Sequence, residues 1–306
     1  MRCTWTILLA GVLVAGCTNE PGSKTLTKGT LKIECDEAIA PVMQKEIEDF
    51  QKQYTDAHIT QRVVEARVAV SDFANDSVEV IVCARPFNKE ERDALTAAMI
   101  QFQEFKVAMS AVAVIVNKDV PVAQLRVSEL DSMLTGDITR WPTKGPRRVI
   151  DLAIGGLNSS ANEVVKGTVL KGKAFALSAT PYSSSKELVD YVRRTPGSLG
   201  IVGLNWLQGV GEEVTPVALG TPGFSPDSTE APGQYYKPVQ AYVFQQYYPI
   251  TTPVYIYSRE TSVDVGLGFI SYVSSAAGQK IFLNDGLVPA TMPVRLVHLT
   301  SEQVKK

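Results

Sequence analysis

Strand-like and helix-like patterns alternate from residue 30 onward, and this alternation limits the possible folds more than any other feature of the chain. Short β-branched or apolar runs at 30–34, 58–64 and 78–82 are typical of strands, and residues with helical periodicity lie between them. After the third run, Asn88 is placed as the N-cap of a helix that reaches about Met99 and has acidic residues in its first turn. This order predicts a largely parallel α/β sheet whose ligands bind beyond the carboxyl ends of its strands.

The same alternation continues through the rest of the chain. Ala111–Asn117 is the strongest apolar run and predicts a fully buried strand, whereas residues 219–238 are rich in Gly, Pro, Ser and Thr and predict a long irregular loop. Trp141 ends a turn and is expected to be exposed. Further strands are expected at 149–154, 198–202 and 253–258, and further helices at 66–74, 128–134, from near Ser160, at 183–194 and at 263–284 with a break near 276–278.

The amino terminus predicts export. Arg2 precedes an apolar run, Ile7–Val14, which is too short for a stable membrane span of about 20 residues and is typical of a signal peptide. The run ends in Ala15-Gly16-Cys17, which resembles a bacterial lipobox, so we expect residues 1–17 to be a lipoprotein signal whose Cys17 is lipidated. Residues 18–29 are polar and predict a flexible tether. The protein is therefore expected in the periplasm or at the cell surface, anchored to a membrane by lipid.

Charge and residue counts exclude several functional classes. The 30 basic and 32 acidic side chains give a net charge of −2, which leaves no basic surplus for nucleic acid. Only two histidines, His58 and His298, are available, and both are expected at the surface. Four cysteines are present; with Cys3 removed and Cys17 lipidated, Cys35 and Cys83 remain as a disulfide or as two buried thiols.

Three loops share one design in which a strand is followed by small polar residues and then a helix. They are Cys35–Ala38, Cys83–Pro86 and Asn158–Asn162. The free N–H groups at such a turn, together with the helix dipole, favour an anion. Hydroxyl groups and an arginine in the same loops would add donors, although the same residue types also cap helices without any ligand. The candidate ligand-binding residues in these loops are Asp36, Glu37, Ala38, Arg85, Asn158, Ser159 and Ser160.

Catalytic motifs are weak. Ser183–Lys186 matches Ser-x-x-Lys, but no Ser-Asp-Asn partner is present, and Gly197–Gly203 lacks the Lys-Ser/Thr and the acidic residue of nucleotide loops. The acids Glu34, Asp36 and Glu37 have no histidine nearby. We therefore predict no enzyme activity, no cofactor and no metal.

The order of motifs resembles the PstS-like phosphate-binding lipoproteins of ABC importers, which have a periplasmic-binding-protein fold. The resemblance covers about residues 28–295 and is carried by Val78–Pro86 with Asn88–Glu91, Val107–Asn117, Leu130–Trp141, Pro196–Leu204, Tyr248–Tyr257 and Phe269–Pro289. The ligand loops differ from the family. Cys35–Ala38 replaces Gly-Ser-Ser-Thr, Ser110-Ala111 replaces the Asp-Gly of the hinge, and Gly155–Leu157 lacks the usual arginine. Through this hinge position the resemblance adds Ser110 to the candidate ligand-binding residues.

The resemblance implies a type II periplasmic-binding-protein fold with two α/β lobes and a ligand cleft between them. Lobe I would comprise 30–108 and 250–298, and lobe II 109–249. The implied function is capture of phosphate or a related small oxyanion by a monomer, for delivery to the permease of an ABC transporter. The alternative is a sensor or surface interaction lipoprotein that uses the same fold for a different ligand.

Overall fold

The computed structural model describes residues 25–142, 148–220, 234–259 and 263–291. Strands and helices alternate as the sequence predicts, which confirms the α/β class. The elements are β1 (Gly29–Asp36), α1 (Ala40–Gln53), β2 (Ala57–Val64), α2 (Ala66–Ala74), β3 (Val80–Cys83), α3 (Lys89–Ala97), β4 (Gln103–Asn117), β5 (Gln124–Arg126), α4 (Val127–Thr135), β6 (Asp151–Gly155), α5 (Ser160–Thr168), β7 (Thr180–Tyr182), α6 (Ser185–Arg194), β8 (Ser198–Gly203), the 3₁₀ helix η1 (Leu204–Leu207), β9 (Val214–Pro216), β10 (Ala218–Gly220), α7 (Gln240–Phe244), β11 (Thr251–Ser258), α8 (Val265–Val273), α9 (Ala276–Asn284) and β12 (Val288–Pro289).

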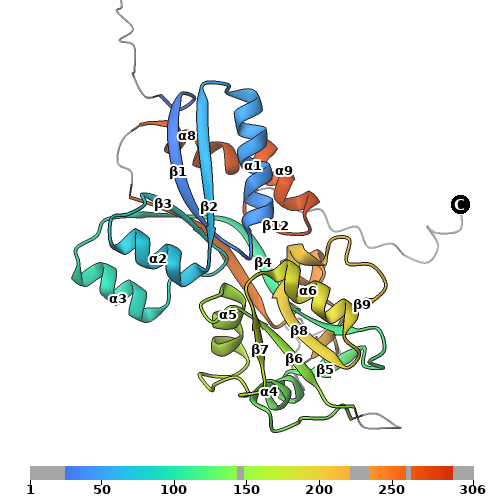
Figure 1. The fold of residues 1–306 in the computed structure, drawn as a ribbon. Coiled ribbons are helices and arrows are strands. Elements are labelled where there is room, and N and C mark those ends of the chain that lie inside the picture. Colours follow the sequence, from blue (N-terminus) through green and yellow to red (C-terminus); the bar gives the residue numbers. More distant parts are fainter. Residues whose placement is uncertain (1–24, 143–147, 221–233, 260–262, 292–306) are drawn as a thin grey trace, which may run out of the picture.

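The first lobe is a mixed sheet with helices on both faces, in which β1, β2 and β3 are parallel and β11 is antiparallel to β3. Strand β1 pairs in parallel with β2 on one side and with β3 on the other, so the loops that follow these strands open at one edge. The buried residues of α1, α8 and α9 pack against one face of the sheet, and those of α2 and α3 pack against the other (Figure 1). Helix α3 begins at the predicted N-cap, where Asn88 and Glu91 form a capping box.

Two neighbouring strands connect the lobes. The first half of β4 pairs antiparallel with β11, and from Val112 onward β4 pairs instead with β8 and β9 of the second lobe. In Figure 1 these strands run side by side between the two bodies. Residues 112–116 of β4 are nearly inaccessible to solvent, as the apolar run predicts. The predicted lobe boundaries at 108/109 and 249/250 lie close to this crossing and stay a prediction.

The second lobe repeats the design of the first on a smaller scale. Strand β6 pairs in parallel with β7 and β8, and helices α5 and α6 follow β6 and β7 along the chain. The expectation that Trp141 is exposed is wrong, because its side chain is buried and its indole N–H donates to the Gly197 carbonyl at 2.8 Å. An aromatic residue in a polar turn can serve as a core anchor when a backbone acceptor receives its N–H.

Several predictions concern residues outside the described part of the chain. These are the signal peptide with Cys17, most of the tether, most of the loop at 219–238, and His298. Residues 25–28, at the end of the predicted tether, form a turn in which Thr25 and Lys28 exchange backbone hydrogen bonds. Among the described residues, no helix combines the length and the apolar composition that crossing a membrane requires.

Cys35 and Cys83 are buried free thiols on opposite faces of the first-lobe sheet. Cys35 lies beside Val82 in the register of β1 and β3, and both pack in the core cluster that contains Phe50. Cys83 packs in the other cluster, with Phe73. Side chains on opposite faces of a sheet cannot form a disulfide without moving the backbone, so the free-thiol alternative holds in this structure.

We expect both thiols to stay unreactive in the folded protein, because burial raises the pKa of each. A full chain carrying Cys3→Ser and Cys17→Ser should titrate with Ellman's reagent only after unfolding, and should then show two thiols without added reductant. A chain that shows no thiol under those conditions would contradict the assignment.

Candidate functional site

The three predicted loops converge on the carboxylate of Asp36. This side chain ends β1 and is fully buried. Its Oδ1 accepts the N–H of Ala38 at 3.2 Å, and its Oδ2 accepts the N–H of Ala84 at 3.0 Å and the hydroxyl of Ser160. Ala38 lies after β1, Ala84 after β3 and Ser160 at the start of α5, so the donors come from all three loops and from both lobes.

The pKa of Asp36 is raised by burial, while its hydrogen bonds and the nearby charge of Arg85 act in the opposite direction. Removal from water penalises the carboxylate, and the donors that surround it stabilise its negative charge. The donors therefore offset part of the cost of burying a carboxylate at this point.

The backbone donors expected to receive an external anion are paired within the first lobe. The N–H of Glu37 donates to the Val64 carbonyl at 2.8 Å, and the N–H of Ile39 donates to the Asp36 carbonyl at 3.0 Å. Ile39 is the N-cap of α1 and makes no side-chain cap hydrogen bond. The backbone N–H groups of this loop therefore donate to Asp36 and to the sheet.

Arg85 lies next to the site but directs its donors away from the Asp36 carboxylate. Its guanidinium makes two hydrogen bonds of 2.7 Å with the carboxylate of Glu91 and one of 2.9 Å with the Pro86 carbonyl. Its side chain is only 3% exposed, and its Nε has no hydrogen-bond partner. Burial alone would raise the pKa of Glu91, but the hydrogen bonds and charge of Arg85 lower it.

The loop before α5 holds Ser160 in place. Ser159 caps this helix by accepting the N–H of Asn162 at 3.4 Å, and the Asn162 amide donates to the carbonyls of Gly155 and Gly156 at 2.9 Å. Asn158 contributes its carbonyl, which accepts the N–H of Arg67 across the lobes at 3.3 Å. Ser160 alone among the three predicted residues of this loop reaches Asp36.

A small cavity of about 10 Å³ lies between the lobes beside this cluster. That is roughly the room needed for one water molecule. Thr252 on β11 and Asn205 in η1 were not anticipated from the sequence, because only the tertiary fold brings them here. The lining comprises the predicted Ala38, Ser110 and Ser160, together with Ala84, Ala111, Val112, Ala161, Gly203, Asn205 and Thr252.

Further contacts join the two lobes around the cavity. Glu37 accepts the N–H of Ser185 at 2.8 Å and its hydroxyl at 2.7 Å. The indole of Trp206 donates to the Ala38 carbonyl at 3.1 Å, and Arg67 forms a 3.5 Å ion pair with Glu163. The cleft is therefore closed in this structure.

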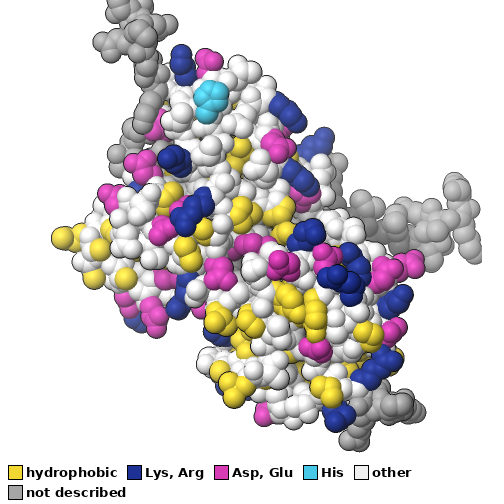
Figure 2. Space-filling model, in the orientation of Figure 1, with side chains coloured by type: hydrophobic (Ala, Val, Ile, Leu, Met, Phe, Trp, Pro, Cys, Tyr) yellow, Lys and Arg dark blue, Asp and Glu magenta, His cyan; other side chains and the backbone are white. Residues whose placement is uncertain are grey.

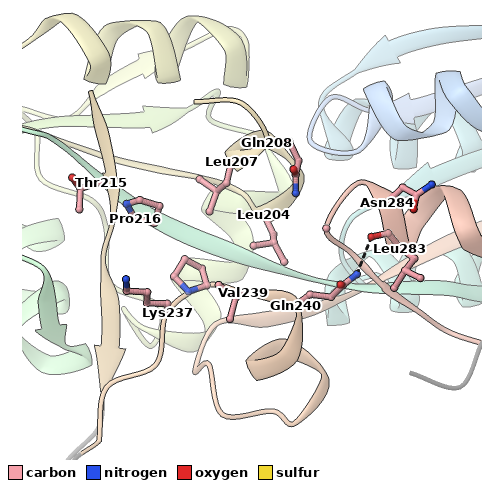
Figure 3. A pocket seen from close by; sticks show the side chains of 12 residues that line it. Leu204, Leu207, Gln208, Thr215, Pro216, Lys237, Val239, Gln240, Leu283 and Asn284 are labelled. Atoms are coloured by element: carbon pink, nitrogen blue, oxygen red, sulfur yellow. Dashed lines mark hydrogen bonds between the residues drawn. The ribbon is translucent and has the colours of Figure 1, made fainter. Parts of the chain in front are cut away.

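A larger hollow of about 460 Å³ lies elsewhere, between η1, α7 and the end of α9, and Figure 3 shows its lining. Among the described residues that line it, Lys237 alone is charged and none is a predicted site residue. Acidic and basic side chains are mixed over the face drawn in Figure 2. Within the described ranges, no group of three or more His, Cys, Asp and Glu side chains could hold a metal ion.

Comparison with known proteins places the chain among binding proteins. A model of the PBP superfamily domain matches residues 21–277. The chain is similar to the phosphate-binding protein PstS of Staphylococcus epidermidis, with 24% identity over 90% of this chain and 84% of that protein. It is also similar to protein SphX of Synechococcus elongatus, with 24% identity over 82% of this chain and 74% of that protein.

Solved structures show the same fold. The chain matches a putative phosphate ABC transporter substrate-binding protein from Clostridium perfringens, solved with bound phosphate, with a TM-score of 0.73 and 19% identity over 86% of this chain and all of that one. It also matches an ABC-type phosphate transport receptor from Vibrio cholerae, with a TM-score of 0.66 and 16% identity over 85% of this chain and all of that one. The predicted two-lobe binding-protein fold is thus confirmed.

Proposed function

This chain belongs to the PBP superfamily, and on that premise we propose that it is an extracytoplasmic solute-binding lipoprotein of an ABC importer, with phosphate or a related small oxyanion as its ligand. The relatives named for phosphate binding support this ligand. The observation that carries the proposal is the convergence of donors from three loops and both lobes on one buried carboxylate. A site that stabilises a carboxylate there has the donors that an oxyanion needs.

The proposed mechanism is capture by closure. A ligand that binds groups of both lobes favours the closed state, and hinge motion at the β4 and β11 crossing opens and closes the cleft. Delivery to a permease completes the role. Lipid on Cys17 would keep the monomer at the membrane beside that permease, and the binding and transfer require no enzymatic step or cofactor.

A second candidate is a sensor or interaction lipoprotein with a ligand other than phosphate. The specific observation that favours it is the pairing of Arg85 with Glu91, which commits both terminal nitrogens of this guanidinium to a carboxylate of the protein itself. Two acids, Asp36 and Glu37, also lie at the cleft. Both proposals use the same fold and differ in the ligand.

Phosphate at one hundred times its Kd should stabilise the folded protein by about 2.7 kcal/mol, which raises Tm by roughly 4 °C for a chain of this size. The measurement is a thermal-shift panel on protein stripped of bound ligand, with phosphate, sulfate, phosphonates, amino acids and Ca²⁺. If millimolar phosphate leaves Tm unchanged while another compound raises it, the phosphate proposal fails and the second candidate gains support.

A further inference from the structure

The Asp36 carboxylate makes the contacts across the lobes that a bound anion would make. In the first lobe it accepts the N–H groups of Ala38 and Ala84, and in the second lobe it accepts the hydroxyl of Ser160. All three donors line or adjoin the small interlobe cavity. The negative charge that these three donors surround is therefore that of a side chain of the protein.

The carboxylate and the hydroxyl that bond to each other across the lobes are both buried. Asp36 is 0% exposed and Ser160 is 2% exposed, so the carboxylate and its hydroxyl partner are shielded from bulk water in this structure. An anion with the volume of phosphate does not fit a cavity of about 10 Å³. The state in which the cleft is closed is therefore also the state in which Asp36 occupies these donors.

We propose that Asp36 is a tethered internal anion that occupies the oxyanion seat of the cleft and holds the two lobes closed without ligand. An external oxyanion must displace this carboxylate before it can use the same donors. Asp36 therefore competes with the ligand and lowers its affinity. This proposal rests on the proposed function for the identity of the ligand, but its claim about closure does not.

The first test measures closure without phosphate. Small-angle X-ray scattering on stripped protein should give a closed profile for the wild type and a larger radius of gyration for Asp36→Ser, which lacks the bridging carboxylate. Asp36→Asn keeps the shape without the charge and serves if the serine variant fails to fold. An open wild type, or variants as closed as the wild type, would overturn the proposal.

The second test measures phosphate affinity by isothermal titration calorimetry. Asp36→Ser should bind phosphate at least about tenfold more tightly than the wild type, a factor that corresponds to about 1.4 kcal/mol. Glu163→Gln is the matched control, because it removes an interlobe acid that forms an ion pair with Arg67 and leaves the seat occupied. We expect its affinity to change less than threefold.

The outcomes separate this proposal from the proposed function. Weaker phosphate binding by Asp36→Ser than by the wild type would make Asp36 a ligand-contacting residue and overturn the proposal. An equal gain in affinity in Glu163→Gln would mean that the effect comes only from removing a negative charge, and would also overturn the proposal. If the serine variant opens and no variant binds phosphate, the internal anion is supported and phosphate is excluded as the ligand.

Discussion

Replacing Arg85 by methionine is expected to lower the free energy of unfolding by about 3 kcal/mol, because it leaves the largely buried Glu91 carboxylate with the Asn88 N–H in place of its charged partner. The pair is held by two hydrogen bonds of 2.7 Å, and the side chains are 3% and 11% exposed. Urea unfolding at neutral pH measures the effect. The exposed pair of Arg92 and Glu104, at 2.9 Å, is the control, and Arg92→Met should cost less than about 1 kcal/mol.

A double-mutant cycle separates the structural role of Arg85 from a ligand-binding role. If Arg85 mainly neutralises Glu91, the double variant Arg85→Met/Glu91→Gln should lose less unfolding free energy than the two single variants lose in sum. A loss below 1 kcal/mol for Arg85→Met, combined with a large loss of anion affinity, would instead assign the guanidinium to the ligand. Unchanged anion affinity in a folded Arg85 variant would remove it from the site.

Local patterns predicted the elements that position the site. The helix at 66–74 has the predicted bounds, and Asn88 caps α3 as its spacing from Glu91 suggests. These features depend on neighbours within one or two turns of the chain, which the sequence displays directly. The order of the six family motifs extended this to the two-lobe fold.

The contacts within the site depend on distant residues and could not be predicted. Asp36 and Ser160 are 124 positions apart, so no local pattern shows that one satisfies the other. The sequence predicts that Arg85 faces an external anion. In the structure its guanidinium bonds the carboxylate of Glu91, which lies in the next helix. Trp141 was misplaced for the same reason, because its acceptor lies 56 residues away. The sequence shows which residues carry a charge, but the tertiary packing determines which of these residues contact each other.

Glu46 should give the second large effect, because its carboxyl is fully buried on α1 and neither oxygen has a hydrogen-bond partner. Burial, followed by the charges of Asp49 and Asp285, raises its pKa from 4.5 to about 9. At pH 7 the folded protein must therefore hold a proton that the unfolded chain releases. Replacement by methionine should stabilise the protein by about 1–3 kcal/mol at pH 7, since 2.5 pH units correspond to roughly 3 kcal/mol at most.

The pH dependence fixes the sign of this effect. Below pH 4.5 the carboxyl is protonated in both states and contributes no slope, whereas between 4.5 and about 9 the folded state binds the extra proton. The contribution of Glu46 to stability therefore falls as pH rises through this window and levels off above pH 9. Glu46→Gln should remove that slope from unfolding curves measured between pH 5 and 9. Glu48→Gln, which changes an exposed acid on the same helix, should leave it intact. Equal slopes in wild type and Glu46→Gln would mean that the carboxyl is ionised in the folded protein, and that a charge is stabilised there without a hydrogen bond.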